Sequence, residues 1–296
     1  MKKIRVCVVG YGNVGREAVE ALGQTPDMEL AGVIRRATGE GPTGIPVATG
    51  VESFGPVDAA LLTIPSRIVP EAAPLYLRKG INTIDGYDLQ GEAMVELRQN
   101  LDRLAREGSA VAVTGAGWDP GTDSIIRMLF SAIAPVGITC TDFGPGISMG
   151  HSTMARAIPG VRDAVAVTLP LGCGEHRRDI YVTLEQGAIF SEIAAKIKAD
   201  PLFKSSRTEV IRVDQLTPCK NRSHAVRITR TGSSGSAHNQ LLELKMRITN
   251  PAAAAQIMIS AARATMRLQP GSYLLGEIPP IDLLPGSREA IIRKMV

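Results

Sequence analysis

Residues 4–15 read Ile4-Arg5-Val6-Cys7-Val8-Val9-Gly10-Tyr11-Gly12-Asn13-Val14-Gly15. A short apolar run is followed by a G-x-G-x-x-G turn and then by a helical pattern. In this context the first glycine allows a tight turn, the second lets the backbone approach a pyrophosphate, and the third lets the helix pack on the strand. The helix N-terminus presents N–H groups and the positive end of its dipole to the phosphates. We therefore predict a dinucleotide site at Gly10, Tyr11, Gly12, Asn13, Val14 and Gly15, the alternative being glycines that serve packing alone.

Two arginines, Arg35 and Arg36, follow the next apolar run, Met28–Ile34. An acidic residue here would bind the 2′-hydroxyl of the adenine ribose and repel a 2′-phosphate, whereas guanidinium groups offer forked donors to a dianion. This predicts NADP rather than NAD as the cofactor. The other interpretation is a solvated basic end of a strand. Three residues that follow later predicted strands are assigned to the same cofactor site: Pro65, Ser66 and Tyr87.

Short apolar strands alternate with helical patterns over the first part of the chain. The predicted strands are Arg5–Val9, Met28–Ile34, Asp58–Ile64, Ile81–Asp85 and Ser109–Thr114. The predicted helices are Val14–Leu22, Val69–Lys79 and Glu92–Glu107. This alternation is typical of a parallel sheet with helices on both faces and ligands at the carboxyl ends of its strands. The predicted fold class is therefore α/β, with an N-terminal Rossmann-type parallel sheet.

The pattern changes after Gly115. Glycine and proline are dense over residues 115–150, and every second residue is apolar in Leu242-Glu243-Leu244-Lys245-Met246-Arg247-Ile248. Such alternation indicates antiparallel strands with one buried and one solvated face. We predict a dinucleotide-binding domain at residues 1–117 and a second, α+β domain at residues 118–254. The final helices, at roughly residues 255–296, are candidates for packing back on the first domain.

Charge and composition argue against several classes of protein. The net charge is only +4, from 33 basic and 29 acidic residues, and the arginines are scattered, so we expect no nucleic-acid partner. The four cysteines form no C-x-x-C pair, which favours reduced thiols and the cytoplasm. Met1-Lys2-Lys3 runs directly into the first strand, and the longest apolar stretch, Ala252–Ala262, is short. We therefore expect neither a signal peptide nor a membrane span.

Three further stretches carry chemistry rather than packing. They are Tyr87-Asp88, Gly117-Trp118-Asp119-Pro120-Gly121 and Phe143-Gly144-Pro145-Gly146-Ile147-Ser148-Met149-Gly150-His151-Ser152. All three are expected to face the cleft in which a nicotinamide would lie. The four histidines show no metal-ligand spacing, so no metal is expected.

With these stretches the chain resembles the meso-diaminopimelate D-dehydrogenase family. The resemblance continues through Ile158-Pro159-Gly160-Val161, Thr168-Leu169-Pro170, His176-Arg177-Arg178, His238-Asn239, Asn250-Pro251, Pro279-Pro280 and Leu284-Pro285. It covers nearly the whole chain. The compact length and the Ser148-Met149-Gly150 sequence are similar to the shorter, more substrate-tolerant branch.

The resemblance implies an NADP-dependent oxidative deamination in lysine and diaminopimelate metabolism. The D-centre of meso-2,6-diaminopimelate would lose hydride to nicotinamide, giving L-2-amino-6-oxopimelate (which cyclises to tetrahydrodipicolinate) and ammonia. The reverse reaction would be reductive amination. The resemblance also implies a homodimer, formed through the second domain, which would bind the substrate as well.

Three residues are the catalytic candidates. Asp88 and Asp119 supply negative charge to hold the substrate ammonium and accept its protons, and Trp118 offers a flat wall that helps to exclude water. Structural roles compete with two of these assignments. Asp119 also suits a cap for the next helix, and Trp118 also suits an ordinary core.

The substrate-binding candidates lie in the second domain. They are Phe143, Gly146, Ser148, Met149, Gly150, Thr168, Arg178, His224 and Asn250. Backbone N–H groups around Gly146 and Ser148 suit the reacting carboxylate. The family pattern points to Thr168, Arg178 and His224 for the distant carboxylate, with Arg178 as its forked partner. His224 also suits a purely structural place, and Arg178 also suits an ion pair with an acidic neighbour, Glu175 or Asp179.

The chain departs from the family pattern before His224. Ser223 stands where the family usually has glycine, which narrows the backbone freedom of a loop expected at the far end of the substrate. The sequence therefore leaves two other functions open. One is a dehydrogenase of other D-amino acids, diamino acids or amines, and the other is an NADP-sensing protein without catalysis.

Overall fold

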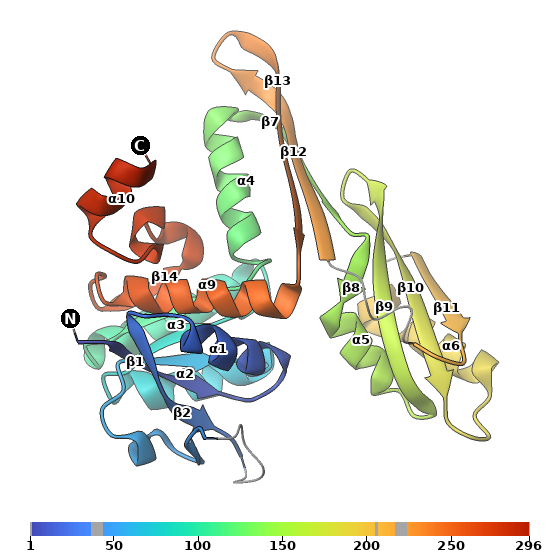
Figure 1. Cartoon of the computed structure of the whole chain (residues 1–296). Coiled ribbons are helices and arrows are strands. Elements are labelled where there is room, and N and C mark those ends of the chain that lie inside the picture. Colours follow the sequence, from blue (N-terminus) through green and yellow to red (C-terminus); the bar gives the residue numbers. More distant parts are fainter. Residues whose placement is uncertain (1, 37–43, 205–206, 217–223, 296) are drawn as a thin grey trace. The chain divides into compact units, whose positions relative to one another are not determined.

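A computed structural model of the chain describes residues 2–36, 44–204, 207–216 and 224–295, with the side chain of Met149 also outside the described part. The chain divides into two compact units (Figure 1). Unit 1 comprises Met1–Met128 and Pro251–Val296, and unit 2 comprises Leu129–Asn250. The domain ranges expected from the sequence, 1–117 and 118–254, stay predictions.

Unit 1 is built on a seven-stranded parallel sheet in the order β14-β6-β5-β4-β1-β2-β3. Its strands are β1 (Ile4–Val9), β2 (Met28–Ile34), β3 (Val47–Ala48), β4 (Ala59–Leu62), β5 (Asn82–Asp85), β6 (Val111–Thr114) and β14 (Gly271–Leu274). The central strands are apolar on both faces, as a sheet covered on both sides requires. The predicted α/β class with a Rossmann-type sheet is confirmed.

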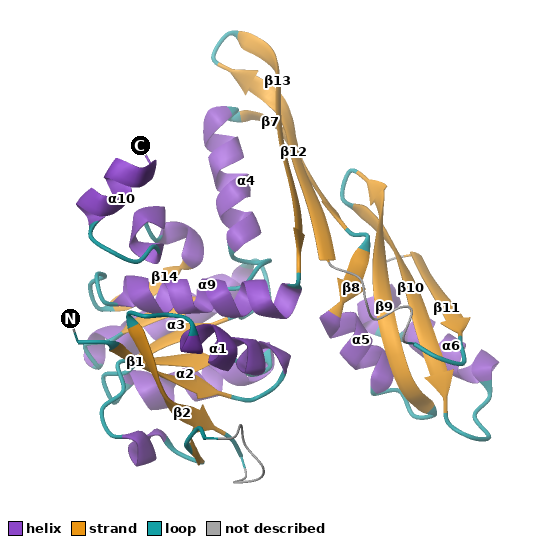
Figure 2. Cartoon of the chain, in the orientation of Figure 1, coloured by secondary structure: helices purple, strands orange, loops and turns teal. Residues whose placement is uncertain are grey.

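Helices cover the two faces of this sheet (Figure 2). Those of unit 1 are α1 (Asn13–Gly23), α2 (Val69–Leu77), α3 (Glu92–Glu107), α4 (Thr122–Ile133, which ends in unit 2), α9 (Asn250–Thr265, which starts in unit 2) and α10 (Arg288–Met295). On one face α2 and α3 bury Leu77 and Leu101, and on the other α1 and α9 bury Leu22 and Ile259. The helices that follow β1 and β4 therefore lie on opposite faces.

The sequence does not predict the two strands at the sheet edges, β3 and β14. Strand β14 has four residues, follows Pro270, and pairs in parallel with β6. With Pro270 before it and Gly271 and Ser272 as its first residues, this segment has the composition of a turn rather than that of an apolar strand. The C-terminal segment thus supplies both a helix and an edge strand to unit 1.

Unit 2 contains two sheets, with strand orders β11-β10-β9-β8 and β13-β12-β7. Its strands are β7 (Val136–Phe143), β8 (Gly146–Ser148), β9 (Val161–Gly172), β10 (Glu175–Leu184), β11 (Arg207–Arg212), β12 (His224–Ser234) and β13 (Ala237–Ile248). Its own helices are α5 (Met149–Arg156), α6 (Phe190–Ala199) and α7 (Pro201–Lys204). All strand pairs are antiparallel except β10 with β11. The predicted antiparallel pairing is therefore confirmed for most of this unit.

The alternation expected in β13 is present. From Leu242 to Ile248 the apolar residues are half-buried and the charged residues between them are exposed. The buried face continues across the sheet. Ile228 of β12 pairs with Leu244 of β13 on one side and with Thr141 of β7 on the other, and it is fully buried. One face of this sheet is therefore packed and the other solvated. No helix in the described part of the chain is both long and apolar enough to cross a lipid bilayer.

Candidate functional site

The glycine turn after β1 leads directly into α1, whose N-cap is Gly12. A Cβ atom on Gly10, where φ is +92°, would lie 2.7 Å from the Thr63 carbonyl oxygen, and one on Gly15 would lie 2.4 Å from the Gly10 carbonyl oxygen. No described atom lies within 4 Å of a Cβ position on Gly12, and no side chain caps the helix. Packing therefore requires Gly10 and Gly15, whereas the space over Gly12 and the first N–H groups of α1 suit a phosphate.

Strands β1 and β4 are neighbours in the sheet, and the helices that follow them lie on opposite faces. The carboxyl ends of these two strands are therefore the topological switch point of the sheet. Such a point is where α/β sheets bind ligands, because the helices diverge to opposite faces. Thr63, directly after β4, lies against the glycine turn: its hydroxyl is 3.0 Å from the carbonyl oxygens of Val9 and Gly10. Beside the turn, the Arg16 guanidinium stacks on the Tyr11 ring, with Cζ of Arg16 lying 5.7 Å from the ring centroid. The turn is therefore held from both sides.

The other cofactor candidates lie at neighbouring strand ends. Arg35 and Arg36 follow β2 directly, and the Arg35 N–H donates to the Ala48 carbonyl oxygen at 2.9 Å, while Arg36 is exposed. After β4, Ser66 accepts a hydrogen bond from the Asp88 N–H through its Oγ at 3.2 Å. The chain segments after β4 and β5 are therefore joined, as a common ligand site at this edge of the sheet requires.

Strand β5 ends in a buried acid that the sequence analysis missed as a site residue. One carboxylate oxygen of Asp85 accepts from the Tyr87 N–H at 2.9 Å, the Thr114 hydroxyl at 2.8 Å and the Gly115 N–H at 3.3 Å. Burial raises the pKa of Asp85 to about 6, although these donors lower it. Asp85 thus fixes the backbone that carries Tyr87, which is buried, and Asp88, which is exposed.

The Gly-Trp-Asp-Pro-Gly segment forms a closed loop before α4. The Gly117 N–H donates to the Pro120 carbonyl oxygen at 3.2 Å, and the Asp123 N–H donates to the Trp118 carbonyl oxygen at 3.0 Å. A Cβ on Gly121 would lie only 2.0 Å from the Gly117 carbonyl oxygen, so the loop closes only because this residue is glycine. Trp118 is buried at 5% exposure.

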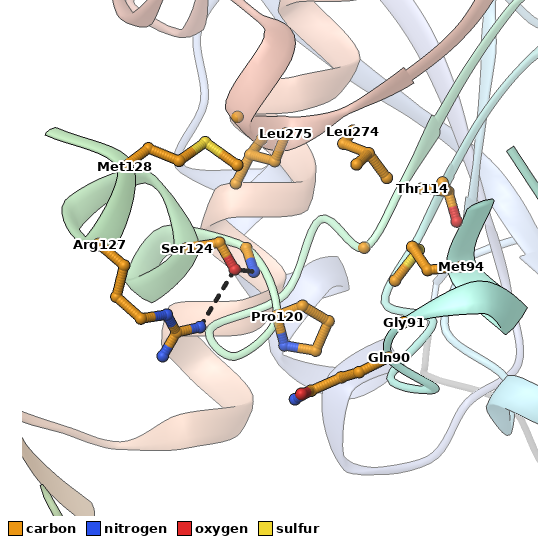
Figure 3. A pocket seen from close by; sticks show the side chains of 13 residues that line it. Gln90, Gly91, Met94, Thr114, Pro120, Ser124, Arg127, Met128, Leu274 and Leu275 are labelled. Atoms are coloured by element: carbon orange, nitrogen blue, oxygen red, sulfur yellow. Dashed lines mark hydrogen bonds between the residues drawn. The ribbon is translucent and has the colours of Figure 1, made fainter. Parts of the chain in front are cut away.

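Asp119 projects from this loop to a cation on α4. Its Oδ1 lies 2.5 Å from Nη2 of Arg127, and the same nitrogen donates to the Ser124 hydroxyl at 3.2 Å. Figure 3 shows Arg127 and Ser124 beside Pro120, on the wall of a cavity of about 220 Å³ in unit 1. The contact described for the Asp119 side chain is thus an ion pair rather than a helix cap. The sequence around Asp119 gives no sign that Arg127, eight positions later in the chain, is its ion-pair partner.

A second acid, Asp123, follows Asp119 in the chain and lies in the first turn of α4. Its side chain is fully buried, and neither carboxylate oxygen has a hydrogen-bond partner among the described residues. Burial raises the pKa of Asp123 to about 7, with a further increase from the Asp119 charge and an opposing decrease from Arg127. The loop and the first turn of α4 therefore carry two acids of different character: Asp119 is ion-paired with Arg127, and Asp123 is buried with a pKa raised to about 7.

In unit 2, three substrate candidates lie side by side on three strands. Thr168 of β9 is the direct cross-strand partner of both Gly146 on β8 and Arg178 on β10. Thr168 is buried and Arg178 half-buried, and burial lowers the pKa of Arg178. The acidic neighbour Asp179 forms its ion pair with Arg177, at 2.9 Å. The row brings together a hydroxyl, a guanidinium and a glycine backbone on one face of the sheet.

Phe143 and His224 lie beside a histidine that the sequence analysis left without a role. The Phe143 N–H donates to Nε2 of His176 at 2.8 Å, and the Phe143 ring centroid is 5.6 Å from that of His176 and 6.2 Å from that of His224. Nδ1 of His224 lies 2.8 Å from the Ile147 carbonyl oxygen. Burial lowers the pKa of both histidines, and the Arg178 charge adds to the effect at His176.

The remaining candidates lie at the ends of helices. Ser148 is the N-cap residue of α5, and its Oγ lies 2.7 Å from Nδ1 of His151. Burial, and then the charge of Arg178, lower the pKa of His151 to about 4. Gly150 is exposed on α5, and Asn250 is the half-buried first residue of α9. The side chain of Met149 and the segment 217–223, which includes Ser223, lie outside the described residues.

The chain is similar to known dehydrogenases along its whole length. Residues 117–174 match the family described as the diaminopimelic acid dehydrogenase C-terminal domain. The sequence is 46% identical to the meso-diaminopimelate D-dehydrogenase of Bacteroides fragilis, with 100% of both chains covered. Among solved structures, the C. glutamicum DAP dehydrogenase in complex with DAP is 30% identical, with a TM-score of 0.90 and 100% of both chains covered. An engineered D-amino acid dehydrogenase bound to NADP+ is 29% identical, with a TM-score of 0.86 and 100% of both chains covered.

Proposed function

The chain belongs to the meso-diaminopimelate D-dehydrogenase family, and we propose that it catalyses the NADP-dependent oxidative deamination of the D-centre of meso-2,6-diaminopimelate. The D-carbon gives up a hydride, the amine becomes an imine, and water converts the imine into the keto acid with release of ammonia. Reductive amination is the reverse. The observation that carries this proposal is the 46% identity over the full length of the Bacteroides fragilis enzyme.

We propose that the glycine turn and the arginine pair hold NADP, with Pro65, Ser66 and Tyr87 completing its site. The open space over Gly12 and the N-terminus of α1, which no side chain caps, support a pyrophosphate at this place. Arg35 and Arg36 come directly after β2, where the adenine ribose and its 2′-phosphate would lie. When bound, the cofactor supplies the acceptor for the hydride.

The acids of unit 1 are proposed to handle the substrate ammonium and its protons. Asp88 is exposed beside Ser66, at the same edge of the sheet as the glycine turn. Asp119 is held by Arg127 and is only partly exposed, at 15% of its side chain, so its carboxylate is well oriented. Trp118, buried next to it, would exclude water from the reacting centre.

Thr168 and Arg178 are proposed to bind the distant carboxylate of the substrate. Arg178 offers two parallel N–H donors, and the Thr168 hydroxyl is its neighbour across the strands. Burial and the Arg178 charge lower the pKa values of the nearby histidines, His151 and His176, and so disfavour their charged forms. Arg178 is therefore the cation that would attract an anion to this face, and a neutral histidine can still donate one hydrogen bond.

Further substrate contacts are proposed for the segments around these two residues. Backbone N–H groups around Gly146 of β8 and Ser148, the N-cap residue of α5, would bind the reacting carboxylate as an anion nest, with Gly150 of α5 assigned beside them. Met149 is assigned to the same segment from the sequence. Phe143, His224 and Asn250 would contact the rest of the substrate, with His224 toward its distal end.

A substrate panel with NADP reduction as the readout tests this function. meso-Diaminopimelate should give the highest kcat/KM, and the LL-isomer, which has no D-centre, should give no turnover. Simple D-amino acids such as D-alanine serve as comparison. Turnover of simple D-amino acids without turnover of meso-diaminopimelate would instead favour a dehydrogenase of other D-amino acids. Binding of NADP with no turnover of any substrate would favour an NADP-sensing protein.

We further propose a homodimer formed through the apolar, exposed part of unit 2. Ile138 of β7 and Leu241 of β13 are joined in one row through Thr231 of β12, and they are 71% and 64% exposed. Val136 and Ile133 nearby in the chain are also more than half exposed. Exposed apolar side chains gathered in one row are typical of an interface.

The cytoplasm is the compartment we propose for this protein. Cys7, Cys140 and Cys173 are free thiols in the described part of the chain, and Cys7 is buried. Reduced cysteines are the usual state in the cytoplasm.

A further inference from the structure

Two cysteines of unit 2 meet although 33 positions separate them in the sequence (173 − 140 = 33). Cys140 lies on β7, and Cys173 lies in the turn that joins β9 to β10. Hydrogen bonding with Cys173 raises the pKa of the Cys140 thiol, which makes the two side chains neighbours. Both are free, Cys173 is exposed, and Cys140 is half-exposed.

A second contact holds the turn against the same face of β7. The Gly174 N–H donates to Oδ1 of Asp142 at 2.8 Å. Because alternate residues of a strand point to the same side, Asp142 and Cys140 share one face of β7. The residue next to Gly174 in the turn is Cys173, so this hydrogen bond places the turn beside Cys140 independently of the thiol contact.

The backbone on both sides of the pair is also anchored. Strand β7 is held by β12, with Cys140 paired to Thr229. Beyond the turn, His176 accepts from the Phe143 N–H, which ties β10 to the end of β7. These contacts, together with the hydrogen bond between Gly174 and Asp142, hold the turn that carries Cys173 against β7, which carries Cys140.

We propose that Cys140 and Cys173 are a modification site at which a reversible intrachain disulfide forms, with a low-molecular-weight disulfide such as oxidised glutathione as the oxidant. The Cys173 thiolate attacks one sulfur of the oxidant, a mixed disulfide forms at Cys173, and one glutathione thiolate leaves. The Cys140 thiolate then attacks the Cys173 sulfur and displaces the second glutathione. Two protein thiols lose two protons and two electrons, and one glutathione disulfide becomes two thiols.

The order of these steps follows from the surroundings of the thiols. Cys173 is the more exposed of the two, so the oxidant meets it first. The hydrogen bond with Cys173 raises the pKa of Cys140, and burial and the neighbouring charges of Cys173 and Asp142 raise it further. A thiol with a raised pKa is the slower nucleophile toward an external oxidant but reacts readily once the mixed disulfide lies beside it.

The site differs from the remaining cysteines. Cys7 is fully buried in β1, and burial raises its pKa to about 12, so it is expected to stay reduced. Cys219 lies outside the described residues, and the experiment must therefore exclude it by substitution. Disulfides of cytoplasmic proteins are commonly transient, which fits a reversible link at an exposed turn.

Treatment of the full-length protein with oxidised glutathione, followed by peptide mapping without reduction, tests the proposal. We expect a Cys140–Cys173 linked peptide, a decrease of two in the number of titratable thiols, and full reversal by dithiothreitol. The Cys219→Ser variant should form the same link. The Cys140→Ser variant should stop at a glutathione adduct on Cys173. The oxidised wild type should also unfold at a higher temperature than the reduced form, because the link restricts the unfolded chain.

Three results would overturn the proposal. They are the absence of the linked peptide in the wild type, a link that involves Cys219, and a link between two chains on a non-reducing gel. None of these readouts depends on dehydrogenase activity, so the disulfide and the proposed reaction fail or succeed separately.

Discussion

Nη2 of Arg127 lies 2.5 Å from Oδ1 of Asp119, which makes the acid of the Gly-Trp-Asp-Pro-Gly loop one half of an ion pair. The arginine comes from the second turn of α4, and it also bonds Ser124 of the same helix. A carboxylate held by a charged hydrogen bond keeps one orientation, as proton transfer requires. The loop and the helix therefore act together in positioning Asp119.

Asp119→Asn should lower kcat for meso-diaminopimelate by roughly 10²–10⁴-fold, the range expected when a group that accepts protons is removed. The dissociation constant for NADP should change little, because Asp119 is not part of the proposed cofactor site. Steady-state kinetics and a fluorescence titration with NADPH measure the two quantities. Glu71→Gln, at an exposed acid on α2, is the matched control. An unchanged kcat in Asp119→Asn would refute the role of this acid.

Gly12→Ala should impair NADP binding, whereas Gly15→Ala should impair folding stability. A Cβ on Gly12 meets no described atom, so Gly12→Ala should keep the unfolding free energy within about 0.5 kcal/mol and weaken NADP binding, since the methyl enters the phosphate space. A Cβ on Gly15 would lie 2.4 Å from the Gly10 carbonyl oxygen, so Gly15→Ala should lower the unfolding free energy by about 1–3 kcal/mol. Denaturant unfolding and NADPH titration separate the two effects. Equal NADP affinity in wild type and Gly12→Ala would contradict a pyrophosphate at this turn.

Replacing Arg35 and Arg36 together by Gln should raise the KM for NADP much more than that for NAD. A charge-assisted hydrogen bond contributes about 1.5–3 kcal/mol, so the ratio of the two KM values should change by about tenfold or more. The effect should weaken at high salt because the phosphate and the arginines are partly screened there. Arg16→Gln, beside the turn but near Tyr11, is the comparison variant. Parallel changes in both KM values would show that the pair does not contact the 2′-phosphate.

Asp123 should make stability depend on pH. Its pKa is raised to about 7 in the folded chain from 3.8 when unfolded, so the folded state holds the proton more tightly. The contribution of Asp123 to the free energy of unfolding is fully present below about pH 4. It is lost as pH rises toward 7, at about 1.4 kcal/mol per pH unit. Asp123→Asn removes this dependence of the unfolding free energy on pH. The dependence that comes from Asp85, whose pKa is raised to about 6, remains in the variant.

Urea unfolding of wild type and Asp123→Asn at several pH values between 4 and 8 measures the difference. The two proteins should be similar in stability near pH 4, and the variant should be the more stable of the two above pH 7. Parallel stability curves over this range would show that Asp123 titrates near its ordinary pKa.

Ile138→Asp and Leu241→Asp should each turn the proposed dimer into a monomer. A charge in an apolar interface loses its hydration without gaining a partner. Sedimentation velocity measures the mass of the species at several protein concentrations. Arg207→Asp, at an exposed position of β11 in the other sheet, should stay dimeric. A wild type that sediments as a monomer at micromolar concentration would refute the dimer.

The family resemblance read from the sequence is confirmed by the full-length relatives, and most of unit 1 was predictable. Its strands are apolar runs between turn residues, and its helices have the helical period. The edge strand β14 was not predictable, because Pro270, Gly271 and Ser272 have the composition of a turn, and the segment becomes a strand by pairing with β6.

The sequence by itself determined the glycine turn, the arginine pair and the positions of the candidate acids, because those signals depend on residues close together in the chain. Only the tertiary structure decided which distant groups meet. It paired Asp119 with Arg127, aligned Gly146, Thr168 and Arg178 across three strands, buried Asp123, and brought Cys140 to Cys173. These contacts follow from helix phase, strand register and burial, which are settled by packing over the whole chain and leave no local mark in the sequence.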